Sequence, residues 1–125
     1  MDIQSLFSLK GRTALITGGS RGIGKMIACG FIGQGAKVYI SSRKAEVCEA
    51  VADELGSNCI AVPQDISTVE GCNALAAIME EREDSIDVLV NNAGAAWGEP
   101  FESHPEEGWD KVMNLNLKSV FFLTQ

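Results

Sequence analysis

The chain has 125 residues, of which 46% are apolar and 22% are charged, so it can bury a core and fits one globular domain. Its formal net charge of −7 excludes broad binding to nucleic acid or to an anionic membrane surface, because both require basic patches. No apolar run approaches the ~20 residues of a membrane span, and the acidic start at Asp2 does not resemble a secretory signal. We therefore expect a cytoplasmic protein.

The first half of the chain predicts strands that alternate with helices. Residues 13–17 predict a strand that stops in a glycine cluster, and residues 22–33 predict a helix. The apolar face expected for this helix consists of Ile23, Met26, Ile27, Gly30 and Phe31. A second strand is predicted over residues 37–41, and a second helix over residues 44–55.

The second half continues the alternation. A third strand is predicted over residues 59–63, and Ser67-Thr68-Val69-Glu70 has the form of a capping box that begins a helix ending near Glu83. A fourth, strongly apolar strand is predicted over residues 86–90. The segment Ser103-His104-Pro105-Glu106 predicts a second capping box, with its proline at the first helical position, and a helical pattern then continues to Gln125.

This alternation indicates an α/β fold of the Rossmann type. Strands that alternate with helices form right-handed crossovers, and hence a doubly wound parallel sheet covered on both faces. Nearly continuous apolar strands, such as residues 87–90, agree with a sheet that is buried on both sides. No linker, repeat or low-complexity segment interrupts the chain, so residues 1–125 are expected to form one domain with the first four strands of such a sheet.

The four cysteines are Cys29, Cys48, Cys59 and Cys72, and no two of them have CxxC spacing. This pattern predicts reduced, mostly buried cysteines and no metal site.

A glycine-rich turn joins the first predicted strand to the first predicted helix, in the segment Thr17-Gly18-Gly19-Ser20-Arg21-Gly22-Ile23-Gly24. Glycines let the backbone turn tightly and approach a ligand closely, and the N–H groups and dipole of the following helix favour phosphate. A strand, a glycine turn and a helix in this order predict a site for the diphosphate of a dinucleotide. A glycine cluster alone is a weak signal, because isolated glycines usually form only turns.

Three further motifs accompany the turn: Asp65-Ile66 after the third strand, Asn91-Asn92-Ala93-Gly94 after the fourth, and Asn116 in the last helix. Together with the glycine spacing, they closely resemble the short-chain dehydrogenase/reductase family over essentially the whole chain. The resemblance implies a nicotinamide dinucleotide at the carboxyl edge of the sheet and hydride transfer to or from a small-molecule carbonyl or alcohol substrate.

The resemblance also implies a role for each residue of the glycine turn. Gly18, Gly22 and Gly24 would shape the turn around the pyrophosphate, and Ser20 would lie within it against the cofactor. Ile23 would pack under the nicotinamide side, with its N–H near phosphate.

The other motifs receive roles in the same way. Asp65 would accept a hydrogen bond from the adenine amino group, and Ile66 would flank the ring. Three consecutive residues, Asn92, Ala93 and Gly94, would line the cofactor. Asn116 resembles the family's helix-kinking asparagine, which holds a water in the proton relay, and is the one catalytic residue expected in this chain. Taken singly, each of these residues also has an ordinary structural reading as a turn, cap or loop residue.

The end of the second predicted strand indicates which nicotinamide dinucleotide binds. NAD-binding enzymes normally carry an acid there, which accepts hydrogen bonds from the ribose 2′-hydroxyl. Here that position is Ser42, the next residue is Arg43, and Arg21 lies inside the glycine turn. Guanidinium groups bind phosphate in a forked geometry, so we expect NADP(H). The alternative is that Arg43 only begins the second helix as a solvated charge.

The family transfers hydride with a serine, a tyrosine and a lysine four residues after the tyrosine. The one tyrosine of this chain, Tyr39, lies inside the second predicted strand, and Arg43 stands four residues later. We therefore expect the cofactor-binding half of a longer reductase, inactive by itself. Its fourth strand and the face of its last helix with Val120, Phe121 and Leu123 would stay uncovered, which predicts a poorly soluble or partly molten chain.

Within the family, the glycine turn and the arginine after the second strand resemble NADPH-dependent 3-oxoacyl-thioester reductases, an analogy that suggests the substrate class. A sugar or polyol oxidoreductase is the alternative within the same class. A non-catalytic module that binds a dinucleotide or a partner chain is the alternative outside it, and a plain structural α/β domain would bind no dinucleotide at all. The resemblance also implies a homo-oligomer, a tetramer or dimer built partly on the last helix.

Overall fold

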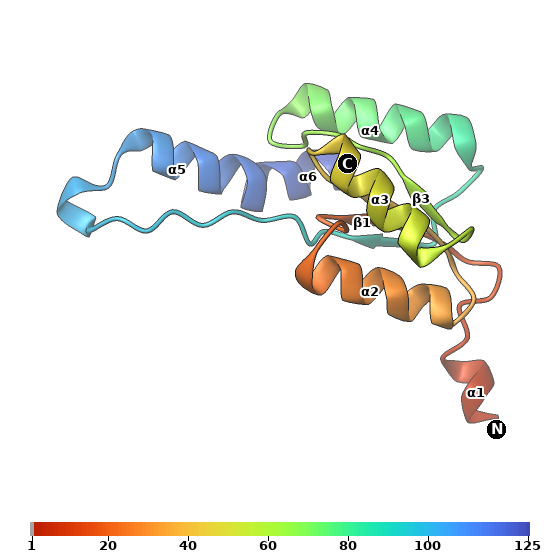
Figure 1. Ribbon diagram of the computed structural model, residues 1–125. Coiled ribbons are helices and arrows are strands. Elements are labelled where there is room, and N and C mark those ends of the chain that lie inside the picture. Colours follow the sequence, from red (N-terminus) through yellow and green to blue (C-terminus); the bar gives the residue numbers. More distant parts are fainter. Residues whose placement is uncertain (1) are drawn as a thin grey trace.

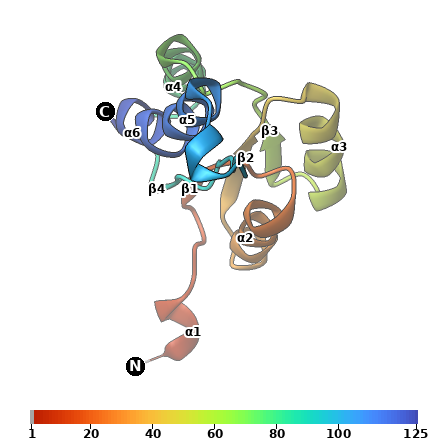
Figure 2. The same cartoon turned by 90° about the vertical axis from the view of Figure 1, so that its left-hand side faces the viewer.

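Four parallel strands form the centre of the computed structural model, which describes residues 2–125. The strands are β1 (Thr13–Thr17), β2 (Lys37–Ser41), β3 (Cys59–Ala61) and β4 (Val88–Val90). Their order in the sheet is β3-β2-β1-β4 (Figure 2). β2 and β3 follow on one side of β1, and β4 then pairs with β1 on the other side. The strand order therefore reverses between β1 and β4. The α/β class and the parallel sheet are confirmed.

Helices cover both faces of this sheet. On one side lie α2 (Gly22–Gly33) and α3 (Ala45–Leu55), and on the other lie α4 (Val69–Arg82) and α6 (Ser119–Thr124) (Figure 2). The remaining helical segments are α1 (Ile3–Leu6), a 3₁₀ turn (Phe101–Ser103), α5 (Glu106–Met113) and a π-helix (Asn114–Lys118) that joins α5 to α6. Figure 1 shows α5 and the segment before it extending away from the sheet.

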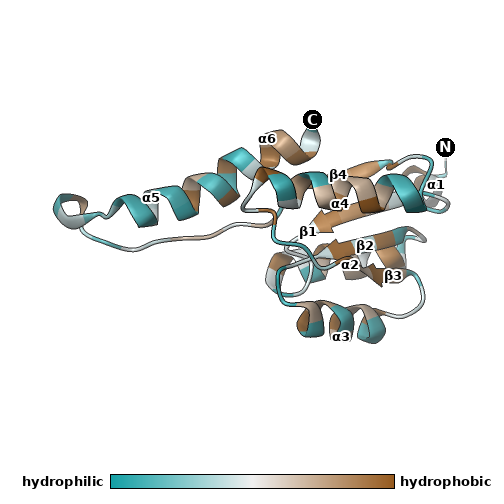
Figure 3. Cartoon of the chain, turned by 90° about the horizontal axis from the view of Figure 1, so that it is seen from above, coloured by the Kyte–Doolittle hydropathy of each residue, from teal (hydrophilic) through white to brown (hydrophobic). Residues whose placement is uncertain are grey.

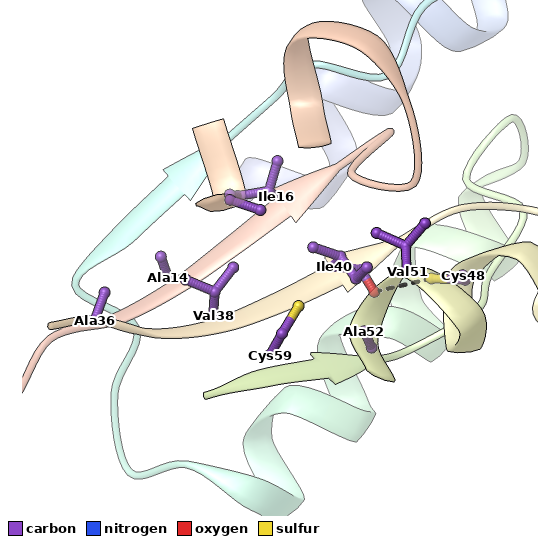
Figure 4. Close-up of a cluster of buried hydrophobic side chains, with 10 residues drawn as sticks. Ala14, Ile16, Ala36, Val38, Ile40, Cys48, Val51, Ala52 and Cys59 are labelled. Carbon is purple, nitrogen blue, oxygen red and sulfur yellow. Dashed lines mark hydrogen bonds between the residues drawn. The ribbon is translucent and has the colours of Figure 1, made fainter. Parts of the chain in front are cut away.

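The strands bury side chains on both faces, which explains their largely apolar sequences. The side chains of Ile16 and Ile40 belong to the cluster that packs against α2 and α3 (Figure 4), whereas those of Leu15 and Tyr39 belong to the cluster on the α4 and α6 side. In the first cluster the Cys48 thiol donates to the Ile40 carbonyl oxygen at 3.3 Å. Adjacent residues along a strand thus face different layers. Ser41, two residues after Tyr39, therefore faces the same layer as Tyr39.

The cysteines behave as expected. Cys48, Cys59 and Cys72 are buried, Cys29 is exposed, and all four are free thiols. Burial raises the pKa of Cys59 to about 11, so this thiol stays protonated in the core.

The buried face of α2 differs from the predicted one. Ile23 and Met26 are each 65% exposed, whereas Gly24 and Ala28 are buried. Small residues at the contact let the helix lie close to the sheet, so the larger side chains at Ile27 and Phe31 are only partly buried at its margin.

The predicted capping boxes are wrong in detail. Thr68, not Ser67, caps α4, because the Thr68 hydroxyl accepts the N–H of Gly71 at 3.1 Å. Gly71 lies against the Asp65 carbonyl oxygen, 1.7 Å from where a Cβ would stand, so the close approach of these two segments fixes where the helix begins. At α5, Pro105 precedes the first helical residue rather than occupying it, and no side chain caps that end.

Two predicted strands are also too long. β3 pairs with β2 through Cys59–Ala61 and ends before Pro63, which has no N–H to donate. β4 pairs with β1 only through Val88–Val90, not from residue 86.

Hydropathy follows the layers of the fold. Figure 3 shows apolar residues concentrated in the strands and polar residues dominating α5. No helix within residues 2–125 is both long enough and apolar enough to cross a membrane.

Candidate functional site

The glycine turn lies at the carboxyl edge of the sheet, between β1 and α2. Gly18 and Gly22 have φ values of +66° and +53°, a region that favours glycine. A Cβ on Gly24 would lie 2.2 Å from the Gly18 carbonyl oxygen, and one on Gly18 would lie 2.9 Å from Asn92 Nδ2. The backbone path itself therefore requires all three predicted glycines, two of them by close contact and Gly22 by its φ.

Thr17 and Asn92 lock this turn to the end of β4. The Thr17 hydroxyl accepts the N–H groups of Asn92 and Ala93 at 3.1 Å and 3.0 Å. The Asn92 side-chain amide donates to the carbonyl oxygens of Thr17 and Gly18 at 3.0 Å and 3.2 Å. The side chain of Asn92 is thus a clamp between two strand ends.

A cleft of about 580 Å³ opens over this edge, a size typical of small-molecule sites. Eleven of the thirteen residues predicted to bind the dinucleotide line it: Gly18, Ser20, Arg21, Gly22, Ile23, Ser42, Arg43, Ile66, Asn92, Ala93 and Gly94. The other two, Gly24 and Asp65, do not line the cleft. Gly24 is buried beneath the turn.

Three cations line the cleft: Arg21, Arg43 and Lys44. Within residues 2–125 the ion pairs join Arg12 to Asp87, Lys25 to Glu54 and Lys37 to Glu83, so none of the three cleft cations forms one. In a chain with a net charge of −7, three unpaired cations in one cleft create a local site for an anion.

Asp65 stands beside the cleft and is held by its own loop. Its Oδ1 accepts the N–H of Ser67 at 3.0 Å. Burial alone would raise the pKa of Asp65, but hydrogen bonds from the backbone and side chain of Ser67, helped by the Arg43 guanidinium, bring that pKa below its usual value. Asp65 is therefore a carboxylate at neutral pH and can accept hydrogen bonds. The next residue, Ile66, is 5% exposed and forms an apolar part of the cleft wall.

Asn116 lies in the π-helix, a segment type that often marks functional sites. Its Oδ1 accepts the N–H of Ala95 at 2.7 Å, and its Nδ2 donates to the Ala95 carbonyl oxygen at 2.9 Å. Ala95 therefore engages both polar atoms of the side chain, which ties the π-helix to the loop after β4. The interruption of the last helix was expected only as a bend at this residue, and a role for Asn116 in holding water stays a prediction.

Five residues that line the cleft were not predicted: Ser41, Lys44, Val47, Gln64 and Leu115. Lys44 and Val47 lie at the start of α3, directly after Arg43. The predicted start of this helix could therefore have indicated that they lie near the cleft. Gln64 is positioned by its N–H, which donates to the Ser42 carbonyl oxygen at 3.1 Å. Neither Ser41 nor Leu115 belongs to a recognisable motif, and only the folded chain brings them to the cleft.

A second cavity of about 820 Å³ adjoins the first and shares Arg21, Arg43, Gly94 and Leu115 with it. Its far wall carries Glu106, Glu107 and Asp110 of α5. The two cavities are therefore neighbours, one lined by the end of β2 and the other by α5.

The family model for short chain dehydrogenases matches residues 12–125 of this chain, from just before β1 to the end of α6. The chain belongs to the short chain dehydrogenase family.

Other short chain dehydrogenases resemble the chain over most of its length. It is 50% identical over 121 residues to the rhamnolipids biosynthesis 3-oxoacyl-[acyl-carrier-protein] reductase of Pseudomonas aeruginosa, which covers 95% of this chain and 47% of the relative. It is 40% identical over 125 residues to the 2-dehydro-3-deoxy-D-gluconate 5-dehydrogenase of Bacillus subtilis, covering 98% of this chain and 49% of the relative.

A solved structure gives the same result. The Pseudomonas aeruginosa RhlG/NADP active-site complex superposes with a TM-score of 0.92 at 50% identity, covering 95% of this chain and 47% of that chain. The chain spans about half the length of the curated relatives it matches.

Proposed function

We propose that residues 1–125 form the NADP(H)-binding domain of a short chain oxidoreductase. One observation carries the proposal: at the end of β2, where an acid would accept the ribose 2′-hydroxyl of NAD, the cleft presents Ser42 and two unpaired guanidinium groups, Arg43 and Arg21. An acid would repel a 2′-phosphate, whereas two guanidinium groups bind it through charge-assisted hydrogen bonds.

The residues present fit the rest of the dinucleotide. The backbone at Gly18 and Gly24 leaves no room for side chains, which brings the turn close to a diphosphate, and the N-terminus of α2 faces the same edge. Ser20 and Ile23 would contact the diphosphate side, while Asp65 and Ile66 would hold the adenine.

The loop after β4 would also hold the dinucleotide. Asn92, Ala93 and Gly94 line the cleft and would contact the cofactor where β4 ends. Asn116 would support the proton relay. When bound, NADPH supplies the hydride, and the residues of this chain hold and orient it.

For the whole protein we propose reduction of a small-molecule carbonyl, with a 3-oxoacyl thioester as the substrate class. The 50% identity to the Pseudomonas aeruginosa reductase supports this choice. A sugar or polyol oxidoreductase is the second candidate, supported by the 40% identity to the Bacillus subtilis dehydrogenase. The one tyrosine of this chain, Tyr39, is buried and donates to Glu83 at 2.5 Å, so we expect residues 1–125 to bind the dinucleotide without turnover.

The test is titration of the protein with NADPH and NADH, followed by nucleotide fluorescence. The wild-type protein is expected to bind NADPH more tightly than NADH. Arg43→Ala removes a charge-assisted hydrogen bond worth about 1.5–3 kcal/mol, so it should weaken NADPH binding about tenfold or more and change NADH binding little.

The matched control is Arg82→Ala, at the last turn of α4 and outside the cleft, which should alter neither affinity. Equal affinity of the wild-type protein for NADPH and NADH would contradict the roles proposed for Ser42, Arg43 and Arg21.

A further inference from the structure

β2 ends with a serine whose buried hydroxyl has no partner. Ser41 is 2% exposed, and within residues 2–125 the buried side-chain oxygen and nitrogen atoms without a hydrogen bond are Ser41 Oγ and Ser42 Oγ. Both residues line the cleft. A buried hydroxyl without a partner costs about 1–3 kcal/mol, so such a group in a native fold needs an explanation. Ser42 is already assigned to the ribose side, but Ser41 has no role in the proposed function.

The surrounding backbone is fully engaged. The Ser41 carbonyl oxygen accepts the N–H groups of Gly18 and Gly19 at 2.8 Å and 3.3 Å, which holds the residue firmly in place. Only its hydroxyl is free to turn, and rotation about χ1 moves that oxygen without moving the backbone.

The neighbouring hydroxyl cannot serve as the partner of Ser41. Thr17 stands opposite Ser41 in the β1–β2 register, and parallel neighbours point to the same face of the sheet. The Thr17 hydroxyl already accepts two N–H groups and donates to the Val90 carbonyl oxygen at 3.4 Å. A molecule bound in the cleft, which Ser41 lines, can supply the missing partner.

The cleft beside Ser41 is suited to a flat ring. By strand alternation Ser41 shares the face of Tyr39, the side on which Ile66, Ala93 and Leu115 pack. These three residues give the cleft an apolar wall, and the Ser41 hydroxyl, which also lines the cleft, is a donor on the same side of the sheet. Ring nitrogens of a purine are acceptors that carry no hydrogen and match this donor.

We propose that Ser41 binds the base of the dinucleotide, by turning its hydroxyl into the cleft and donating a hydrogen bond to a ring nitrogen of the adenine. The inference rests on the proposed function, because the adenine belongs to the NADP(H) assigned to this cleft. Ser41 would thus bind the base, whereas Ser42, Arg43 and Arg21 would bind the 2′-phosphate.

The experiment compares Ser41→Ala with wild type by fluorescence titration of both NADPH and NADH. Loss of one neutral hydrogen bond should weaken both affinities by the same factor, about five- to tenfold, because the two dinucleotides share the adenine. Ser57→Ala, in the exposed turn before β3, is the matched control and should change neither affinity. The melting temperature of unliganded Ser41→Ala should equal or exceed that of wild type, since the variant removes an unpartnered buried hydroxyl.

Each outcome decides the inference. Equal weakening of NADPH and NADH binding, with no loss of thermal stability, supports it. Unchanged affinities, or a loss confined to NADPH, overturn it and leave the proposed function standing, whereas a wild-type protein that binds neither dinucleotide overturns both. If Ser41→Ala fails to fold by circular dichroism, the nearly isosteric Ser41→Cys, a weaker donor, takes its place with the same expectations.

Discussion

At the scale of single residues, the site depends on backbone segments packed so closely that a side chain does not fit between them. Gly24 lies under the turn at the point where a Cβ would meet the Gly18 carbonyl oxygen at 2.2 Å and Asn92 Nδ2 at 2.5 Å. The Asn92 amide donates to that same carbonyl oxygen, so a methyl group here would break the clamp as well as crowd the backbone. Gly24 therefore determines the shape of the cleft without lining it.

Gly24→Ala is expected to lower the free energy of unfolding by about 1–3 kcal/mol, because the added methyl overpacks a contact between two segments of backbone. Urea denaturation followed by circular dichroism measures the change. Gly30→Ala is the control in the same helix, since a Cβ there meets nothing within 4 Å and should stabilise α2 by about 0.5–1 kcal/mol. Equal effects of the two substitutions would show that the Gly24 contact has no special cost.

At this scale the sequence could predict the backbone path of the glycine turn, whereas the roles of these residues in binding the cofactor stay predictions. Glycines at Gly18 and Gly22 and the asparagine at Asn92 could be recognised because their spacing matches a backbone path with positive φ and close contacts. Ser41 could not be recognised, because a serine is common at a strand end and only burial leaves its hydroxyl without a partner. Ile23 and Met26 looked like core residues from their helical spacing, but contact with the sheet is made by the smaller Gly24 and Ala28.

At the scale of elements, one polar cluster joins the start of β2 to the end of α4. Tyr39 donates its hydroxyl to Glu83, Lys37 pairs with the same carboxylate, and the Lys37 ammonium lies 5.4 Å from the centre of the Tyr39 ring. Hydrogen bonds from Lys37 and Tyr39 lower the pKa of Glu83 below 4.5. The bond to Glu83 raises the pKa of Lys37, while burial is the main cause of the raised pKa of Tyr39.

These shifts predict the pH dependence of stability. The stability that ionised Glu83 contributes is complete above pH 4.5, the ordinary pKa of a glutamate, and is lost as the pH falls through its lowered pKa. The contributions of Tyr39 and Lys37 are complete below their ordinary pKa values of 10.0 and 10.5 and are lost as the pH rises through their raised ones.

Glu83→Gln should lower the free energy of unfolding at pH 7 by about 1 kcal/mol and flatten the loss of stability below pH 4.5. Thermal melts across the acidic range measure both effects. Glu81→Gln, exposed on the same helix, should leave the curve unchanged. An acid limb that is identical in Glu83→Gln and wild type would exclude this cluster as its source.

The order of helices and strands could be predicted because the spacing of apolar residues and the positions of glycines are local features of the sequence. The exact first residues of the helices could not be predicted, since they depend on contacts between segments. At α4, Gly71 both donates its N–H to the Thr68 hydroxyl and lies against the Asp65 carbonyl oxygen. The π-helix around Asn116 was likewise beyond a periodicity argument, because it comes with two hydrogen bonds to the distant Ala95.

At the scale of the whole molecule, β4 forms an open edge of the sheet. Within residues 2–125, β4 pairs with β1 alone, and its residues are only partly buried. The helical segments that follow expose large apolar side chains: Trp109 is 61% exposed, Leu117 59% and Phe121 63%. The expectation that Leu123 is uncovered as well is wrong, because Leu123 packs in the cluster on the α4 side of the sheet. An unpaired strand edge beside such side chains favours association.

We therefore expect residues 1–125 on their own to bind a hydrophobic dye and to associate as concentration rises. Sedimentation velocity over a concentration series measures this. Phe121→Ser should reduce association, whereas Phe101→Ser, in the projecting 3₁₀ turn, should have a smaller effect. A monomeric chain with a sharp, cooperative melt would contradict the expectation.

The junction of Thr17, Gly18 and Asn92 has a consequence for how substitutions combine. Segments more than 70 residues apart share the same few donors and acceptors there, so they behave thermodynamically as a single component. The energetic effects of altering Thr17 and altering Asn92 are then not additive: once one is lost, little remains for the other to lose. Replacing both residues should therefore cost less than the sum of the two single replacements, and a double-mutant cycle measures the difference.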